Sequence, residues 1–308
     1  MAIEAQKYIW LDGEFLSWES AQTHLVTHTL HYGLGAFEGI RCYPTFDGGR
    51  AIFRLQEHIR RLYGSCRICQ IDMTISPEEL TSACVELVKK NDMNEAYLRP
   101  IAFLGGESLG IGATDTKVHV GVVAWVFRAP ITEQGVKEGI RAKISSFIRG
   151  GLNTLLAKGK ICGHYVISVL ARKEAALGGY DEALFLDATG HVAEGSGENI
   201  FVVRHGKLCT PPLSSAILEG ITRDTVICLA NDLHIPVEEV FLTRDELYLA
   251  DEVFLTGTAA EITPVKEVDN RLIGDGKPGP ITKKLQEVFF EVVHGKRPLY
   301  AKWLTQVR

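Results

Sequence analysis

Two lysines stand two residues apart in LLAKGKICGHYVIS, residues 155 to 168, a stretch that otherwise resembles protein interior. A lysine that loses its proton becomes a nucleophile and forms a Schiff base with a carbonyl compound, which requires desolvated or cationic surroundings. The apolar neighbours of Lys158 and Lys160 would provide such surroundings. Taken alone, the segment favours a plainer interpretation, in which both side chains lie over apolar surface with their ammonium groups in water.

The glycines around these lysines suggest a second possibility, a nucleotide-binding loop. That motif has four residues between its glycines and a Ser or Thr after the lysine. Here seven residues separate Gly151 from Gly159, and Ile161 follows Lys160. The spacing therefore disfavours ATP binding.

Other segments could supply what a lysine-bound pyridoxal phosphate needs, namely donors for its phosphate, an acid at its ring nitrogen and a donor to its phenolate oxygen. EGITRD, residues 219–224, opens a helix whose first amides, at Ile221 and Thr222, could bind a phosphate dianion. Most helix starts bind only water. Arg61 could add charge-assisted hydrogen bonds to the phosphate, although an arginine on a helix is more often simply exposed to solvent.

A glycine-rich break at 192–199, VAEGSGEN, carries two glutamates. Glycine and asparagine are common in turns for backbone reasons, whereas a turn has no need of acids. A carboxylate from this break could therefore lie against the ring nitrogen.

The elements that must position these groups are strand-rich in the first part of the chain. Asp-Gly turns in YIWLDGEFLSW and in IRCYPTFDGGRAIFRL predict two hairpins. Apolar spacing predicts a helix over 55–68, and SPEE at 76–79 opens another that should end near Lys89-Lys90-Asn91. AYLRPIAFLG and KVHVGVVAWVF are typical of strands.

The second part alternates between strands and helices. Strands are predicted at 141–149, 181–187, 199–203 and 251–257, and helices from about 164 to 177, from 220 and at 280–294. Strands outnumber helices in both parts, which favours an α+β fold over a doubly wound sheet. We expect a small α+β domain at 1–128, a linker at 129–139 and a large cofactor-binding domain at 140–308.

The composition is that of a globular protein, with 46% hydrophobic and 23% charged residues in 308. A net charge of −5 without basic blocks disfavours nucleic acid as a partner. The longest apolar run, 118–127, is shorter than the roughly 18–20 residues of a membrane span. Because no export signal is evident, we expect the seven cysteines to be free thiols in the cytoplasm, with Cys66 and Cys69 as packing residues.

With these segments side by side, the chain resembles the class IV pyridoxal-phosphate aminotransferases, and closely the branched-chain amino acid aminotransferases, almost from end to end. Ordered blocks carry the resemblance: His31-Tyr32-Gly33 with Phe37-Glu38-Gly39-Ile40-Arg41, Glu57-His58 with Arg61-Leu62, Tyr97-Leu98-Arg99-Pro100, Lys160 with Gly163 and Tyr165, Glu194 to Asn199, Gly220 to Arg223, and Gly257 to Pro264. One such block is weak evidence, but an ordered series over more than two hundred residues is specific.

The resemblance implies a two-domain fold-type IV enzyme, with a strand-rich small N-terminal domain, a larger C-terminal domain and the cofactor between them. It implies that Lys160, rather than Lys158, is the Schiff-base lysine. The same residue would also move the proton between the substrate α-carbon and the cofactor. Further cofactor roles are implied for Tyr165 at the phenolate oxygen, Glu194 at the ring nitrogen, and Arg61, Ile221, Thr222 and Thr258 at the phosphate.

For the substrate, the resemblance implies that the turn at Thr258-Ala259 binds the α-carboxylate. The implied side-chain pocket is lined by Tyr32, Phe37, Arg41, Tyr97 and Arg99. Leucine, isoleucine and valine need an apolar wall, whereas glutamate brings a second carboxylate whose burial requires a cationic partner. Aromatic residues beside Arg99 would answer both demands.

The chain departs from the family pattern at two places. His164 replaces an asparagine found in many relatives, and no metal is implied by it. Residues 124–130 read AWVFRAP, whereas the corresponding segment of many family members is similar to Trp-Pro-Trp-Gly-Ala-Tyr. Because that stretch approaches the substrate side chain, Arg128 and Pro130 leave room for activity toward other amines.

The expected activity is therefore transfer of an amino group from leucine, isoleucine or valine to 2-oxoglutarate by a ping-pong cycle. D-amino acid or (R)-amine transamination and aminodeoxychorismate lyase activity are alternatives on the same fold, and a cofactor-binding protein without turnover or a plain scaffold is another class. Tyr97 to Pro100 with Gly39 to Arg41 favours the branched-chain activity. The family also implies a homodimer, in which Gly105 to Thr114 would complete the neighbour's site.

Overall fold

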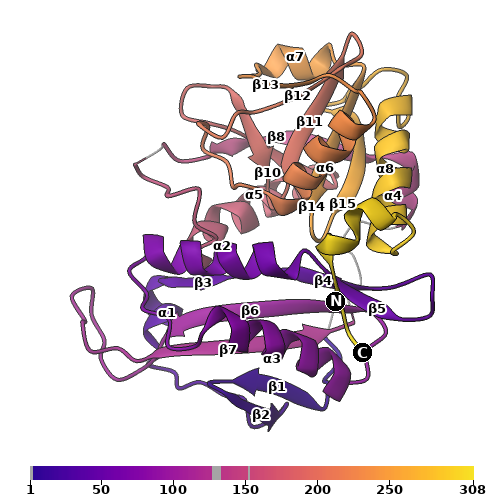
Figure 1. Ribbon diagram of the computed structural model, residues 1–308. Helices are drawn as coiled ribbons and strands as arrows, with labels where there is room; N and C mark the ends of the chain where they lie inside the picture. The colour runs from indigo at the N-terminus through magenta and orange to yellow at the C-terminus, as the bar shows by residue number, and fades with distance from the viewer. Residues whose placement is uncertain (1–2, 127–132, 152) are drawn as a thin grey trace. The chain divides into compact units, whose positions relative to one another are not determined.

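The computed structural model describes residues 3–126, 133–151 and 153–308, and the chain forms two compact units (Figure 1). The first comprises Met1–Arg128, Gly159–Tyr165 and Glu291–Arg308, and the second comprises Ala129–Lys158 and Val166–Phe290. This division differs from the expected domains in two segments. The lysine-bearing segment and the C-terminal tail both belong to the first unit, because each pairs with strands of its sheet.

The expected linker at 129–139 is only partly described. Residues 127–132, which include Arg128 and Pro130, lie outside the described residues. Glu133–Glu138 form a short helix, α4, where an irregular linker was expected. Gln286 Nε2 donates a hydrogen bond to the Val136 carbonyl at 3.0 Å. Tertiary contacts therefore help to stabilise α4, which the local sequence pattern did not predict.

One sheet of eight described strands underlies the first unit. Across the sheet the strands are β17 (Leu304–Gln306), β5 (Arg50–Phe53), β4 (Ile40–Pro44), β6 (Ala96–Leu104), β7 (Val118–Trp125), β1 (Tyr8–Leu11) and β2 (Glu14–Ser17), with β3 (Gly35–Phe37) also paired to β6. The paired strands are antiparallel. Turns at Asp12-Gly13 and Asp47-Gly48-Gly49 join β1 to β2 and β4 to β5, which confirms both predicted hairpins.

The first unit also contains helices, one of which begins at a clear local signal. They are α1 (His28–Tyr32), α2 (Leu55–Ile68), α3 (Pro77–Lys90), and the short 3₁₀ helices η1 (Cys162–His164) and η2 (Pro298–Trp303). Ser76 caps α3 by accepting a hydrogen bond from the Glu79 amide at 3.1 Å, and Pro77 fills the first position. The predicted bounds of α2 and α3 are confirmed.

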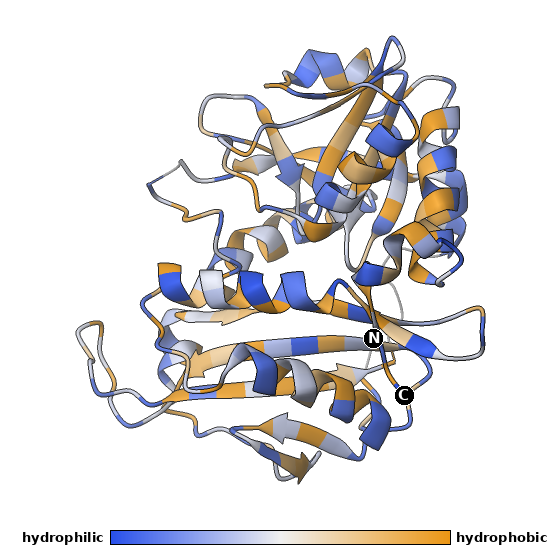
Figure 2. Cartoon of the chain, in the orientation of Figure 1, coloured by the Kyte–Doolittle hydropathy of each residue, from blue (hydrophilic) through white to orange (hydrophobic). Residues whose placement is uncertain are grey.

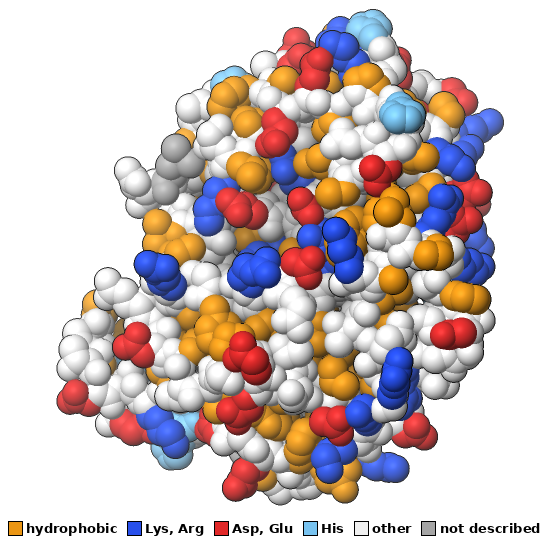
Figure 3. Space-filling view, in the orientation of Figure 1, with side chains coloured by type: hydrophobic (Ala, Val, Ile, Leu, Met, Phe, Trp, Pro, Cys, Tyr) orange, Lys and Arg blue, Asp and Glu red, His pale blue; other side chains and the backbone are white. Residues whose placement is uncertain are grey.

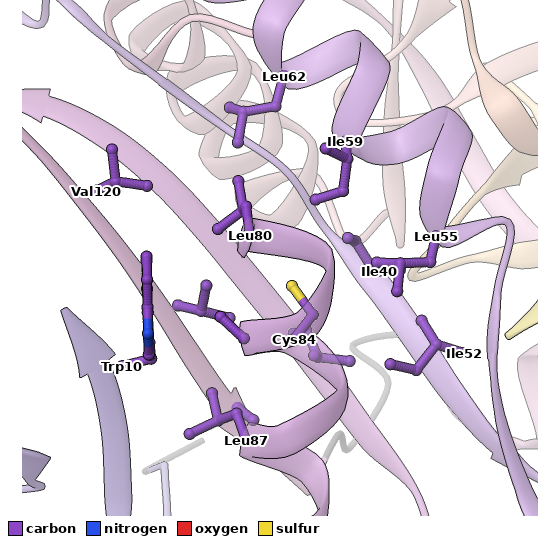
Figure 4. Packing of buried hydrophobic residues seen from close by; sticks show 14 of the residues in the cluster. Trp10, Ile40, Ile52, Leu55, Ile59, Leu62, Leu80, Cys84, Leu87 and Val120 are labelled. Carbon is purple, nitrogen blue, oxygen red and sulfur yellow. The ribbon is translucent and has the colours of Figure 1, made fainter. Parts of the chain in front are cut away.

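A continuous apolar core joins α2 and α3 to one face of the sheet. Figure 4 shows Leu62 of α2 and Leu80 of α3 directed toward one another, with Ile40 of β4 beside Leu55. Orange and blue segments alternate along α3 in Figure 2, as expected for a helix with one buried side. Side chains alternate across a strand, so the odd-numbered residues of β6 are directed to the sheet's other face.

The second unit contains a mixed sheet of nine described strands. Their order is β10 (Val192–Gly195), β9 (Glu182–Leu186), β8 (Ile140–Ile148), β15 (Glu261–Val268), β14 (Glu252–Gly257), β11 (Asn199–Arg204), β12 (Lys207–Thr210) and β13 (Val237–Glu239), with β16 (Arg271–Leu272) beside β15. Its helices include α5 (Tyr165–Leu177), which begins at the boundary of the two units, α6 (Ile221–Asp232), α7 (Arg244–Tyr248) and α8 (Pro280–Val293). Antiparallel pairs such as β11 with β14 accompany parallel pairs such as β8 with β9, so the fold is α+β, as predicted.

Gly33 brings the lysine-bearing segment close to α1. It ends α1 with a φ of 72°, and its carbonyl accepts a hydrogen bond from the Gly163 amide at 2.9 Å. A Cβ at Gly33 would lie 2.8 Å from the Gly163 Cα, whereas a Cβ at Gly48, with a φ of 82°, would meet nothing within 4 Å.

Gly33→Ala should therefore destabilise the protein more than the matched variant Gly48→Ala. Both substitutions force alanine into the left-handed region, at a cost of about 1–2 kcal/mol. Gly33→Ala also forces two backbones apart, which we expect to add about 1–3 kcal/mol. Urea unfolding measures both, and equal losses of unfolding free energy would show that the close approach to Gly163 contributes nothing.

Candidate active site

The segment that carries Lys160 is held against β3 by its backbone. The Phe37 amide donates to the Lys160 carbonyl at 3.1 Å, and Ala36 bridges to Ile161 as in an antiparallel pair. The Lys160 amide donates to Ser65 Oγ of α2 at 2.9 Å. These contacts fix the backbone from which the Lys160 side chain projects.

The amine of Lys160 lies among aromatic groups of the first unit. Its Nζ donates to the Tyr165 hydroxyl at 2.6 Å and lies 5.0 Å from the ring centroid of Phe37. The Phe37 and Tyr165 rings meet edge to face, with centroids 4.8 Å apart. An amine beside a hydroxyl and apolar ring faces is an arrangement suited to a Schiff-base lysine.

Lys158 has different partners, all in the second unit. Its Nζ donates to the carbonyls of Leu213 and Ile217. Burial lowers the pKa of Lys158, an effect that the nearby charges of Glu219 and Glu194 oppose. The two lysines therefore have different surroundings. Of the two, Lys160 contacts a phenol and aromatic rings, whereas Lys158 contacts backbone carbonyls.

Alternation along β6 brings several predicted substrate residues to one face of the first sheet. Tyr97 lies opposite Arg41 of β4 and opposite Trp125 of β7, and Arg99 follows two residues later on the same face. Phe37 of β3 also reaches this face, because the Arg99 guanidinium lies 4.7 Å from its ring centroid. Tyr32 instead lies on α1, about half exposed, with its ring 4.7 Å from that of His28.

The Arg99 guanidinium is surrounded by aromatic rings. Besides Phe37, it lies 5.6 Å from the ring of Tyr97 and 5.7 Å from that of Trp125. Its buried Nε has no hydrogen-bond partner among the residues that the structure describes. A buried N–H donor is normally satisfied, so this group is suited to receiving an anionic oxygen from a ligand.

Arg61 is held by Glu38, a buried acid to which no role was assigned from the sequence. Its Nε and Nη2 donate to the two carboxylate oxygens of Glu38 at 2.6 and 2.9 Å. His58 Nδ1 donates to the same carboxylate at 2.7 Å. His58 and Arg61 lie about one helical turn apart in the sequence, and this spacing indicates that their side chains share one face of α2.

The charges of this trio depend on one another. Burial alone would raise the pKa of Glu38, but Arg61 and His58 outweigh it and hold that pKa well below its ordinary value. Burial lowers the pKa of His58 despite the neighbouring carboxylate, so the ring is neutral at neutral pH. Arg61 also interacts electrostatically with Tyr165 and Tyr97, which places the trio beside Lys160 and the β6 face.

In the second unit, Glu194 lies buried on β10 and accepts hydrogen bonds at both carboxylate oxygens. Arg149, directly after β8, donates from Nε to Oε1 at 2.9 Å. Asn199 Nδ2 and the Leu218 amide donate to Oε2 at 3.2 and 3.0 Å. Neither Arg149 nor Asn199 was assigned a role from the sequence, since their contacts depend on strand pairing.

The first turn of α6 begins at Gly220 and has no side-chain cap. Ile221 and Thr222 are buried there, and a Cβ at Gly220 would lie 1.8 Å from Asn199 Oδ1. Asn199 therefore brings Glu194 close to the start of α6. It also pairs across the sheet with Thr256, two residues before Thr258, and Thr258 and Ala259 form the turn from β14 to β15.

No cluster of three or more His, Cys, Asp and Glu side chains suited to a metal ion occurs in the described part of the chain. Burial raises the pKa of the Cys66 thiol to about 12 and of the Cys69 thiol to about 11, which supports packing roles. Basic and acidic side chains are interspersed over the face shown in Figure 3. None of the described helices is both long and apolar enough to cross a membrane.

Glu198 contrasts with the paired acid Glu194. Burial, followed by the charge of Glu182, raises the pKa of Glu198 to about 8. Its Oε2 accepts a hydrogen bond from the Gly197 amide at 3.0 Å. Because the folded-state pKa lies above the ordinary value of 4.5, the folded protein holds a proton that the unfolded chain releases, and stability falls as the pH rises from about 4.5 to about 8.

Glu198→Gln should therefore raise the melting temperature at about pH 9 and change it little at about pH 4.5, since glutamine imitates the protonated acid. Calorimetry of both proteins across this range tests the expectation. Glu287→Gln, at an exposed position of the same unit, should show no such pH-dependent gain. An equal effect of Glu198→Gln at both pH values would contradict the raised pKa.

Comparison with known proteins agrees with this geometry. The family model described as amino-transferase class IV matches residues 35–268. The branched-chain-amino-acid aminotransferase of Pseudomonas aeruginosa is 47% identical over 300 residues, covering 97% of each chain, and that of Escherichia coli K12 is 42% identical over 308 residues, covering 100% of this chain and 99% of the relative. The crystal structure of a branched-chain aminotransferase from the archaeon Thermoproteus uzoniensis with norvaline has a TM-score of 0.94 and 42% identity and covers 99% of this chain and 100% of that one. The chain therefore belongs to the class IV aminotransferases.

Proposed function

We propose that this chain transfers the amino group of branched-chain L-amino acids to 2-oxoglutarate, with pyridoxal 5'-phosphate held on Lys160. One observation carries the proposal: the Lys160 amine lies 2.6 Å from the Tyr165 hydroxyl, and the Phe37 ring beside it also contacts Arg99. Identity of 42–47% with branched-chain aminotransferases along nearly the whole chain supports it.

The residues present fit this cofactor. The first turn of α6, at Ile221 and Thr222, would hold the phosphate through its amides and the positive end of the helix dipole. Arg61 and Thr258 would add donors to the phosphate, and Tyr165 would donate to the phenolate oxygen. The buried carboxylate of Glu194 is assigned to the ring nitrogen. When bound, pyridoxal phosphate supplies an aldehyde and an electron-withdrawing ring.

Lys160 also serves as the base of the reaction in this proposal. Its amine would take the proton from the substrate α-carbon, and the Tyr165 hydroxyl would hold the amine in position. The Phe37 ring beside the amine would keep it directed toward the substrate. A branched-chain aminotransferase 46% identical to this chain has been solved with pyridoxamine 5'-phosphate and with N-(5'-phosphopyridoxyl)-L-glutamate.

The face of β6 suits two kinds of substrate side chain. Phe37, Tyr97 and Trp125 give leucine, isoleucine and valine an apolar surface. Arg99, with its buried Nε lacking a partner among the described residues, would bind the second carboxylate of glutamate or 2-oxoglutarate. The same 46%-identical relative has also been solved with 4-methylvaleric acid, an apolar branched acid.

The remaining substrate contacts are also proposals. The turn at Thr258-Ala259 would bind the α-carboxylate through backbone amides, and Tyr32 and Arg41 would border the side-chain pocket. We further propose that the enzyme works in the cytoplasm, where its cysteines stay reduced.

A homodimer completes the proposal. The segment from Gly105 to Thr114 carries Ile111 and Leu109, which are 93% and 46% exposed. His28 Nε2 holds this segment by donating to the Gly110 carbonyl at 3.1 Å. An anchored loop with an exposed apolar tip is suited to entering a second copy of the chain.

The overall proposal is tested by supplying the loaded protein with L-leucine and 2-oxoglutarate. We expect 4-methyl-2-oxopentanoate and glutamate in equal amounts, detected by mass spectrometry. Activity confined to D-alanine or an (R)-amine would replace the branched-chain proposal with one of the alternatives on the same fold.

Arg99→Ala should impair the glutamate half-reaction more than the leucine half-reaction. Removing the cationic partner of a buried carboxylate costs about 2 kcal/mol or more, so kcat/KM for glutamate should fall by about 30-fold or more relative to that for leucine. Single-turnover absorbance measurements separate the two half-reactions. Arg141→Ala, at an ion pair with Glu267 on the second unit, is the control, and equal losses in both half-reactions of Arg99→Ala would refute the assignment.

A further inference from the structure

Arg149 and Glu194 form an ion pair inside the second unit. Both guanidinium contacts go to one oxygen, Oε1, from Nε at 2.9 Å and from Nη2 at 2.7 Å. The side chains are only 9% and 4% exposed. A buried carboxylate with a buried arginine beside it is stabilised in its charged form, because removing either partner would leave an uncompensated charge.

The surrounding structure fixes Arg149 in this position. Its amide donates to the Leu186 carbonyl at 2.8 Å, which ties the residue to the end of β9. Its Nη1 donates to Ser168 Oγ at 3.2 Å, and its guanidinium lies 4.9 Å from the ring centroid of Phe185. Both the backbone and the side chain of Arg149 are therefore held by contacts inside the second unit.

Among the residues that the structure describes, the donors to the other oxygen of Glu194 are neutral. Asn199 Nδ2 and the Leu218 amide donate to Oε2. The remaining charged neighbours act from greater distance, since Lys158 and Glu198 interact with Glu194 electrostatically without a hydrogen bond to it among the described residues. The charged partner thus donates to one oxygen of Glu194 and the neutral side-chain donor Asn199 to the other, so each can be removed separately by substitution.

We infer that Arg149 is a positioning residue that keeps the proton shared by Glu194 and the cofactor's ring on the ring nitrogen. The inference rests on the proposed function, which assigns Glu194 to that nitrogen. A carboxylate paired with a guanidinium accepts a proton poorly, so the ring stays protonated and electron-poor. Without the charge at Arg149, the proton would move from the nitrogen to a Glu194 oxygen and leave a neutral pyridine and a neutral acid.

The test uses protein loaded with pyridoxal phosphate labelled with ¹⁵N in the ring. NMR should give the chemical shift of a protonated ring for the unaltered protein and for Arg149→Lys, which keeps the charge. Arg149→Gln keeps N–H donors without charge and should move the shift toward that of a neutral pyridine. Asn199→Ala removes a neutral donor from the same carboxylate and should retain the protonated value.

Two results would overturn the inference: a protonated ring in Arg149→Gln, or an equal change of shift in Asn199→Ala. If Arg149→Gln does not fold, Arg149→Met is measured in the same way with the same outcomes.

A second readout uses cofactor-free protein with ¹³C-labelled glutamate, in which Glu194→Gln identifies the signal. At neutral pH the Glu194 carboxyl should be ionised in the unaltered protein and protonated in Arg149→Gln. Failure of the unaltered protein to bind pyridoxal phosphate would count against the proposed function, whereas an unchanged Glu194 carboxyl signal in Arg149→Gln would count against the influence of Arg149 on that carboxyl.

Discussion

The hydrogen bond between the Lys160 amine and the Tyr165 hydroxyl is the contact on which the proposed chemistry depends. It forms because a seven-residue segment, Gly159–Tyr165, leaves the second unit and pairs with β3 of the first. Ser65 and Gly33 fix the segment's backbone, and the Phe37 ring lies beside the amine. A flexible side chain is thereby held against rigid strands, which is the usual way to place a reactive group accurately.

Buried acids organise the charges around the proposed site. Glu38 holds Arg61 and His58 in the first unit, and Glu194 is held by Arg149 in the second. In each case a guanidinium donates hydrogen bonds to the buried carboxylate. Glu198 accepts no hydrogen bond from a guanidinium among the described residues, and burial followed by the charge of Glu182 raises its pKa. Acids with contrasting environments close together in sequence are typical of active sites, where charge states must differ.

Local signals in the sequence predicted those features that depend on near neighbours. The Asp-Gly turns, the Ser76 cap and the helical spacing of 55–68 need only a few residues to act, and the structure confirms them. The helix α4 and the return of 159–165 to the first sheet depend on contacts between distant segments. The same limit explains the missed site residues: Glu38 meets Arg61 across 23 positions, and Arg149 meets Glu194 across 45. Family resemblance supplied the roles of Lys160 and Glu194, and the residues that support them became visible only in three dimensions.

The identity of the cofactor-bearing lysine tests the account most directly. Borohydride reduces the bond between pyridoxal phosphate and its lysine, and peptide mapping by mass spectrometry then locates the fixed group. The account predicts a single modified position, Lys160, in fully loaded protein, with Lys158 unmodified in the same peptide. Modification at Lys158, or loaded protein with neither lysine modified, would contradict it.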